Sequence, residues 1–161
     1  NDGFEILLIT GTTYYKNAVS SLGAAQNDGI EGAKTGNITI QPYVYNMALA
    51  YNASDLVLAR AGGMTLSEIT ALGLPSIVVP SPNVVGNHQE YNARALEEAG
   101  AAVVIREGPL AEKQIFETVT GLFEDLDRLE QISEAARKIG KPGAALDIAK
   151  ELIALAKRRM V

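Results

Sequence analysis

A turn of small residues between an apolar run and a helical pattern is the part of this chain best suited to chemistry. It reads Arg60-Ala-Gly-Gly-Met-Thr-Leu-Ser-Glu68 and follows the run Leu56 to Ala59, which has the length of a strand. Gly62 and Gly63 let the backbone bend sharply and let a ligand approach its amides, while a helix N-terminus adds about half a positive charge. We predict that the turn binds an anion, with phosphate as the natural ligand. A purely structural turn is the alternative, because no Lys-Ser/Thr pair follows as in a P-loop.

The helix after this turn has the spacing of a capping box. Thr65 would be the N-cap and Glu68 its third residue, which predicts a helix from Thr65 to Leu72. Glu68 has a second interpretation, because a carboxylate one turn from an anion site can accept hydrogen bonds from ribose hydroxyls. The two roles compete for the same oxygens, and both stay open.

A second loop is expected beside the first. The apolar run Ser76 to Pro80 leads through Ser81 to Asn87 into a helical pattern that begins at His88. Asn87 could cap this helix with Glu90 as its third residue, in a second capping box. Ligands of open parallel sheets bind at the carboxyl ends of the strands. We therefore expect this loop and the glycine turn to converge on one crevice.

Polar side chains open the second helix. His88, the only histidine, could be a general base or a donor at the helix start, and the second role is favoured because no Ser or Cys nucleophile pattern lies near it. Gln89 and Asn92 share one helical face and suit sugar hydroxyls, although amides are common at helix starts. Asp125 and Asp127 resemble a metal-binding pair, but they lie in a charged helical stretch. We interpret them as a solvated face and assign no metal.

Strand-like and helical patterns alternate along the chain, which predicts an α/β fold with a Rossmann-like parallel sheet and flanking helices. The expected strands are Glu5 to Thr10, Ile38 to Pro42, Leu56 to Ala59, Ser76 to Pro80 and Ala102 to Ile105, mostly apolar runs typical of strands covered on both faces. The expected helices are Tyr14 to Leu22, Met47 to Asn52, Thr65 to Leu72, His88 to Ala99, Ala111 to Leu126, Leu129 to Lys138 and Ala144 to Arg159. The glycine-rich stretch Ala24 to Asn37 predicts a mobile loop.

Composition narrows the class of protein. A chain of 161 residues is long enough for one domain with its own core. A formal net charge of -5 argues against a nucleic-acid surface. The absence of cysteine excludes disulfides, thiolate metal sites and a cysteine nucleophile. No apolar run approaches the ~20 residues of a membrane span and the first residues do not form a signal peptide, so we expect a cytoplasmic location.

Three motifs together resemble a known family. Arg60 to Glu68, Ala71 to Pro82 and Asn87 to Leu96 resemble, in order and spacing, the C-terminal domain of MurG, the bacterial UDP-N-acetylglucosamine transferase that acts on undecaprenyl-pyrophosphoryl-muramoyl pentapeptide. The resemblance extends from Phe4 to the final helix. It implies the donor half of an inverting GT-B glycosyltransferase of peptidoglycan synthesis, without a cofactor. Residues 1–161 would form the nucleotide-sugar-binding domain.

The resemblance also implies what lies outside this chain. An N-terminal domain, absent here, would bind the lipid-linked acceptor, and the intact protein would be peripheral on the cytoplasmic face of the membrane. The fragment alone is expected to be inactive, and its catalytic base stays unknown.

The resemblance assigns roles residue by residue. Val44 matches the position whose backbone contacts uracil, Glu68 matches the ribose-binding acid, and Gln89 matches the glutamine on the sugar hydroxyls. The turn at Gly63 matches the one that meets the pyrophosphate. The full set implied for UDP-N-acetylglucosamine is Val44, Gly63, Met64, Thr65, Leu66, Ser67, Glu68 and Gln89, with His88, Asn92 and Arg60 as further candidates.

The chain departs from the family at its start, where the family has a strand and a Gly-Gly-Ser-x-Gly-Ala turn that nothing here matches. If the strand order is 3-2-1-4-5-6, that strand lies between the Glu5-to-Thr10 and Leu56-to-Ala59 strands, and each should have an unpaired edge. The alternatives are a related glycolipid glycosyltransferase or epimerase, a non-catalytic nucleotide-sugar-binding subunit completed by a membrane partner, and a sheet domain that binds another phosphate ligand.

Overall fold

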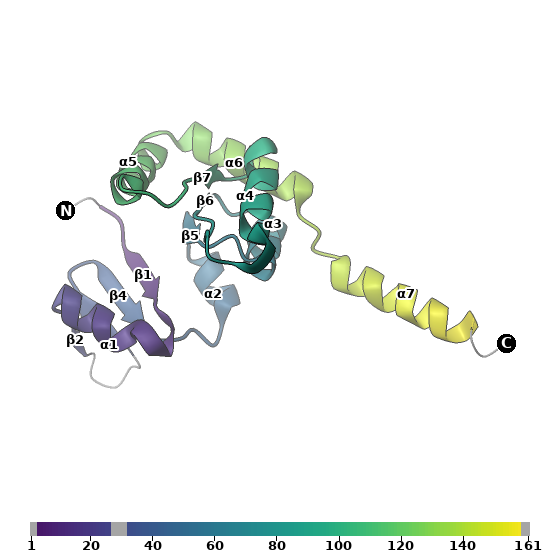
Figure 1. The fold of residues 1–161 in the computed structure, drawn as a ribbon, viewed down its shortest axis with the longest axis horizontal. Coiled ribbons are helices and arrows are strands. Elements are labelled where there is room, and N and C mark those ends of the chain that lie inside the picture. Colours follow the sequence, from purple (N-terminus) through teal and green to yellow (C-terminus); the bar gives the residue numbers. More distant parts are fainter. Residues whose placement is uncertain (1–2, 27–31, 159–161) are drawn as a thin grey trace. The chain divides into compact units, whose positions relative to one another are not determined.

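Residues 3–26 and 32–158 are described by the computed structural model. They divide into two units, Asn1–Asn52 and Ala53–Val161. In Figure 1 the first unit runs from purple to blue and the second from blue to yellow. Among the described residues, no helix combines the length and the apolar character that a membrane-spanning segment requires.

The first unit is built on a four-stranded sheet in the order β1-β4-β3-β2. Its elements are β1 (Ile6–Ile9), α1 (Gly11–Leu22), β2 (Ala25–Gln26), β3 (Ala33–Thr35), β4 (Ile38–Gln41) and α2 (Met47–Asn52). β1 and β4 are parallel, with Ile6 opposite Ile38, whereas β3 pairs with β4 and β2 with β3 in antiparallel fashion. Its buried apolar side chains include Ala33, Ile40 and Tyr51.

The loop predicted over Ala24 to Asn37 is wrong in part, because β2 and β3 lie within it. Ala33 is fully buried and pairs with Ile40, so an antiparallel ladder with the next strand, β4, orders this polar, glycine-rich segment. Such pairing leaves no periodic signal in the sequence. Residues 27–31 of the predicted loop lie outside the described residues.

The second unit has a parallel sheet in the order β5-β6-β7, with Val57 opposite Ser76 and Ile77 opposite Val103. Its elements are β5 (Val57–Ala59), α3 (Gly63–Leu72), β6 (Ser76–Val78), a 3₁₀ turn (Val85–Asn87), α4 (His88–Glu98), β7 (Val103–Val104), α5 (Ala111–Glu124), α6 (Leu126–Ile139) and α7 (Ala144–Arg158). The predicted α/β architecture with a parallel sheet and flanking helices is confirmed.

Helices cover both faces of the sheet in the second unit. Val78 packs in a cluster with side chains of α3 and α4, among them Leu66 and Leu96. Its neighbour Ile77 packs on the other face with Leu122 of α5 and Leu129 of α6, as the alternation of a strand requires. The prediction of strands covered on both faces therefore holds for β6. It is wrong for β1, where the side chains of Ile6, Leu7 and Ile9 are exposed by about 40%.

Two strands lie at sheet edges. β1 ends the order of the first sheet and β5 ends the order of the second, so each is paired on one side in the described chain. These are the two strands for which the family's strand order predicts an unpaired edge.

Helix α3 is fixed at its C-terminal end. The buried hydroxyl of Ser133, on α6, donates a 2.7 Å hydrogen bond to the carbonyl oxygen of Gly73, which ends α3 in the left-handed conformation. Where α6 ends, a Cβ added at Gly140 would lie 2.3 Å from the carbonyl oxygen of Thr70. The two helices therefore approach so closely that only a glycine fits at this crossing.

Candidate functional site

Helix α3 begins at Gly63, two residues before the predicted N-cap. Its N-cap is Gly62, in the extended conformation, and the carbonyl oxygen of Gly62 accepts the first helical hydrogen bond from the N–H of Leu66 at 2.9 Å. The predicted capping box is therefore wrong, because Thr65 already lies in the first turn. Glycine is tolerated at an N-cap, where a serine or threonine side chain is the usual partner.

The first turn of α3 is open to a ligand. The N–H groups of Gly63, Met64 and Thr65 precede the first helical hydrogen bond, so the helix offers them no carbonyl partner. A Cβ added at Gly63 would meet no atom within 4 Å, and the Met64 side chain is 81% exposed. Together with the positive end of the helix dipole, these donors suit an anion.

The next residues of the motif differ in their access to a ligand. The Leu66 side chain is buried in the core, so only its backbone is available to a ligand. Ser67 donates its hydroxyl to the carbonyl oxygen of Gly63 at 2.8 Å, which ties it to the helix itself. Glu68 is exposed, one turn along the helix from the open amides. Of these three side chains, the carboxylate of Glu68 is the best placed for a polar ligand group.

Helix α4 begins with Asn87 as its N-cap, but the second capping box is wrong. Asn87 has a left-handed backbone, with φ 50°, and its side chain makes no capping hydrogen bond. The Glu90 carboxylate accepts hydrogen bonds from Arg106. Nδ1 of His88 lies 2.8 Å from the carbonyl oxygen of Val85, and because a carbonyl only accepts, the ring nitrogen is the donor. This is the geometry of a donor at a helix start.

The amide side chains of α4 hold two loops. The N–H of Ser81, after β6, donates to Oε1 of Gln89 at 2.9 Å. Nδ2 of Asn92 donates to the carbonyl oxygen of Ala61, beside the glycine turn, at 3.0 Å. The loop after β6 and the start of the glycine turn are thus both bound to α4. The opposite end of each amide, Nε2 of Gln89 and Oδ1 of Asn92, has the chemistry to bind a hydroxyl.

Arg60 spans the carboxyl ends of the strands. Its Nη1 atom lies 3.4 Å from the carbonyl oxygen of Val79, after β6, and pairs with the carboxylate of Glu107, after β7. The Arg60 side chain is 55% exposed. Arg60 therefore connects the start of the glycine motif, after β5, with the segments that follow β6 and β7.

Arg106 is a residue of the site region that the sequence did not indicate. Its Nη2 atom donates to Oε1 of Glu90 at 2.8 Å and to Oε2 of Glu97 at 3.0 Å. The hydrogen bond from Arg106 lowers the pKa of Glu97, and the bonds to Glu97 and Glu90 raise the pKa of Arg106. These partners are 16 and 9 residues away, so no local motif signals them. The only hint is that Arg106 follows a predicted strand at the ligand-binding edge.

Val44 belongs to the first unit, whereas every other candidate residue belongs to the second. It is half-buried and precedes α2. The exposed rings of Tyr43 and Tyr45 flank it and meet edge to face, with ring centroids 5.0 Å apart and an angle of 69° between the rings. Two aromatic rings therefore lie next to the backbone of Val44, the residue for which the resemblance predicts a contact with uracil.

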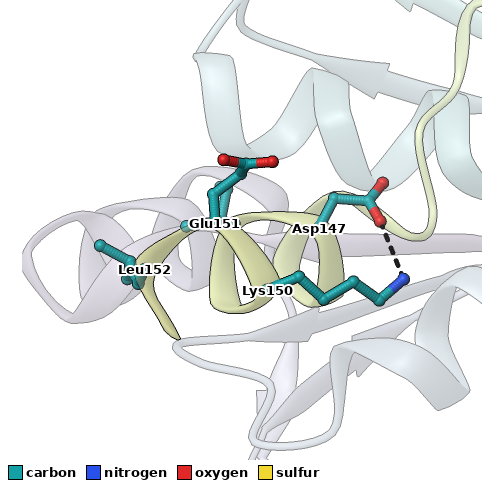
Figure 2. A pocket seen from close by; sticks show the side chains of 5 residues that line it. Asp147, Lys150, Glu151 and Leu152 are labelled. Atoms are coloured by element: carbon teal, nitrogen blue, oxygen red, sulfur yellow. Dashed lines mark hydrogen bonds and ion pairs between the residues drawn. The ribbon is translucent and has the colours of Figure 1, made fainter. Parts of the chain in front are cut away.

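The predicted metal-like pair, Asp125 and Asp127, has other roles in the structure. Asp125 is the N-cap of α6, where its Oδ1 accepts from the N–H of Arg128 at 3.0 Å, and Asp127 is exposed, as a solvated face requires. Within the described ranges, no group of three His, Asp or Glu residues could hold a metal ion. A shallow hollow lies along α7, with the ion pair of Asp147 and Lys150 at 3.4 Å (Figure 2). Its lining residues, from 147 to 152, all come from this one helix, so it lacks the converging loops of the site at α3.

Comparison with known proteins gives consistent matches. The sequence profile of the glycosyltransferase family 28 C-terminal domain matches residues 1–152. A relative from Desulforamulus reducens is 40% identical over 150 residues, and one from Acetivibrio thermocellus is 45% identical over 138. Both are named UDP-N-acetylglucosamine--N-acetylmuramyl-(pentapeptide) pyrophosphoryl-undecaprenol N-acetylglucosamine transferase.

Solved structures agree with these matches. MurG from Acinetobacter baumannii superposes with a TM-score of 0.64 and 25% identity over 92% of this chain and 52% of that one. The glycosyltransferase VinC, at a TM-score of 0.56 and 21% identity over 96% of this chain and 42% of that one, shares the fold. The match with the Desulforamulus relative covers 93% of this chain and 40% of the relative, and the match with the Acetivibrio relative covers 86% and 35%. The chain thus spans less than half the length of these relatives. On the match of residues 1–152, the chain belongs to glycosyltransferase family 28, as a C-terminal domain of the MurG type.

Proposed function

We propose that this chain binds UDP-N-acetylglucosamine as the donor half of an inverting glycosyltransferase, which adds N-acetylglucosamine to the lipid-linked muramoyl-pentapeptide precursor of peptidoglycan. The names of the sequence relatives state this donor and this acceptor. The open first turn of α3, beside the loops held by α4, carries the proposal. The acceptor would bind through the rest of the enzyme, on the cytoplasmic face of the membrane.

The pyrophosphate of the donor would lie against the start of α3. The acceptor hydroxyl attacks the anomeric carbon and UDP departs from the opposite face, so negative charge develops on the pyrophosphate. The N–H groups of Gly63, Met64 and Thr65 are fixed donors at that position, and such donors contribute roughly 3 kcal/mol each to the stabilisation of developing charge. We assign no catalytic base to this chain.

Side chains of α3 and α4 have the chemistry to bind the nucleoside and the sugar. Gln89 holds Ser81 through Oε1 and can donate from Nε2 to a sugar hydroxyl. Asn92 holds Ala61 through Nδ2 and can accept at Oδ1. The Glu68 carboxylate suits the ribose hydroxyls, and the backbone of Val44 suits uracil. One helix would thus both shape the site and contact the sugar.

Calorimetric titration of the chain with UDP and with ADP tests the proposal. We expect UDP to bind more tightly than ADP. Glu68→Ala should weaken UDP binding by about tenfold, because a hydrogen bond to a charged group contributes ~1.5–3 kcal/mol. Glu134→Ala, an exposed carboxylate on α6, is the control and should leave the affinity unchanged. Equal affinity for UDP and ADP would favour another phosphate ligand.

The transferase reaction needs a separate test on the intact protein. Transfer of labelled N-acetylglucosamine from UDP to the lipid-linked acceptor distinguishes a donor domain of an enzyme from a non-catalytic sugar-binding subunit. We expect transfer by the intact protein, whereas UDP binding without transfer would support the subunit.

A further inference from the structure

Two neighbouring residues after β7 connect the parts of the candidate site. Arg106 pairs with two carboxylates of α4, and Glu107 pairs with Arg60 at the start of the glycine motif. We propose that Arg106 is a positioning residue, which fixes the orientation of α4 so that Gln89 meets the sugar of the donor. The identity of the ligand in this inference rests on the proposed function. The contacts of Arg106 with α4 do not depend on it.

The contacts of Arg106 fix a helix rather than a single point on it. Nε and Nη2 of Arg106 lie 2.9 and 2.8 Å from Oε1 of Glu90 in the first turn of α4, and Nη1 and Nη2 lie 3.4 and 3.0 Å from the carboxylate of Glu97. Residues seven apart share one face of a helix, two turns from each other. Two anchors on one face resist both rotation of α4 about its axis and sliding along it.

The amide side chains move with α4. Gln89 adjoins Glu90, and Asn92 lies two residues after Glu90 on the same helix. Their bonds to Ser81 and Ala61 have ordinary lengths of 2.9 and 3.0 Å, and a rotation of the helix would lengthen both. Arg106 thereby acts on the sugar through Gln89, without touching it.

Networks of exposed charges can hold a helix where isolated pairs do not. The Arg106 side chain is 47% exposed and that of Glu90 is 29% exposed, so water screens the pair only in part. A guanidinium offers several donors in a rigid plane and can therefore serve two carboxylates together, whereas an ammonium is a single point of charge. We therefore expect Arg106→Lys to replace only part of this function.

The test compares two ligands on one set of variants. Arg106→Gln should weaken the binding of UDP-N-acetylglucosamine by about three- to fivefold and that of UDP by less, because the sugar meets Gln89 directly whereas UDP depends on α4 only through Asn92 and the glycine turn. A substitution that merely unfolds part of the chain would weaken the binding of both ligands equally. The ratio of the two affinities therefore distinguishes a positioning role of Arg106 from a loss of structure. The affinity ratio of Arg106→Lys should lie between those of the unchanged chain and Arg106→Gln. Arg94→Gln is the matched control, since Arg94 pairs with Glu98 of its own helix at 4.0 Å.

A second measurement needs no ligand. Exchange of the Ser81 N–H, which reports its bond to Gln89, should be faster in Arg106→Gln than in Arg94→Gln, while the amides of Ile77 and Val78 in the sheet keep their protection. The inference would be overturned if Arg106→Gln had the same Ser81 exchange rate and the same affinity ratio as the control Arg94→Gln. Faster exchange with an unchanged ratio would overturn the link to the sugar. If the unchanged chain binds neither ligand, the proposed function fails, and the exchange of Ser81 still decides whether Arg106 positions α4.

Discussion

The two helices that border the candidate site begin in opposite ways. α3 starts at glycines, and the amides of its first turn are open. α4 starts with side chains that bind other segments, namely His88, Gln89, Glu90 and Asn92. Water can satisfy the open donors of α3 until an anion replaces it, whereas the side chains of α4 keep the loops in place. The start of α3 is therefore suited to bind a ligand, and the start of α4 is suited to fix the loops beside it.

The open start of α3 requires a fixed end. The contacts of Ser133 and Gly140 with the last turn of α3 hold the helix against α6, in the part of the core that includes Leu66 and Ala136. Donors stabilise developing charge only when they do not have to reorganise. The crossing of α3 and α6 therefore supports the anion site from the opposite end of the helix.

The largest effect should come from Gly140→Ala, which breaks this crossing. Gly140 has φ −61°, so alanine is not strained there, but its Cβ would lie 2.3 Å from a backbone oxygen. We expect the free energy of unfolding to fall by about 3 kcal/mol, the upper end for overpacking, measured by urea unfolding with circular dichroism. Gly143→Ala is the control, because its Cβ would meet only Asp147 at 3.9 Å. A loss no larger than that of the control would show that the helices separate freely.

Ser133→Ala should have the next largest effect. It removes the 2.7 Å hydrogen bond to Gly73 and leaves a buried carbonyl without its partner, which costs about 2 kcal/mol. Ser76→Ala is the matched control: Ser76 is equally buried, but its hydroxyl has no hydrogen-bond partner among the described residues. That variant should unfold at the same or a higher urea concentration. If the two variants behave alike, the bond of Ser133 does not fix α3.

Asn92→Ala should have a smaller effect on stability and a distinct effect on binding. The loss of its bond to Ala61 should cost about 1 kcal/mol and weaken UDP binding severalfold, because that bond holds the glycine turn. Gln89→Ala, at the same helix start, should weaken only UDP-N-acetylglucosamine. Calorimetry with both ligands makes the comparison. Equal losses for the two variants would mean that α4 holds both loops as one unit, without separate roles.

Sequence patterns predicted the elements of the second unit because helical and strand periods are local. α4 begins at the predicted His88, and α5 begins at the predicted Ala111. The start of α3 was misplaced, because the spacing of Thr65 and Glu68 fits a capping box whether or not a glycine ahead of it takes the N-cap. β2 and β3 were missed, because β3 is ordered by pairing with β4 and β2 by pairing with β3. A motif indicates where a helix lies more reliably than how it begins.

The candidate site was predictable to a similar extent. The glycine turn and the amides of α4 follow from residue types near strand ends, and the structure brings Asn92 to Ala61 and Gln89 to Ser81. The contacts of Arg106 were not predictable. They join the segment after β7 to α4, and the partners lie 16 and 9 residues away in the sequence, beyond the range of any local motif. Side chains that act through the tertiary structure need the structure to be found.

The smallest expected effect is the pH dependence of the Arg106 contacts. Hydrogen bonding to Arg106 lowers the pKa of Glu97 from its ordinary value of 4.5. Because the folded-state pKa is the lower one, the stabilisation is complete above that ordinary value and is lost as the pH falls through the folded-state pKa. The unchanged chain should therefore exceed Arg106→Gln in stability at pH 6 by less than about 1 kcal/mol, the usual limit for exposed pairs. This difference should shrink below pH 4.5 in urea unfolding at each pH, whereas a difference that persists to pH 3 would mean that Arg106 acts through packing and not through its charge.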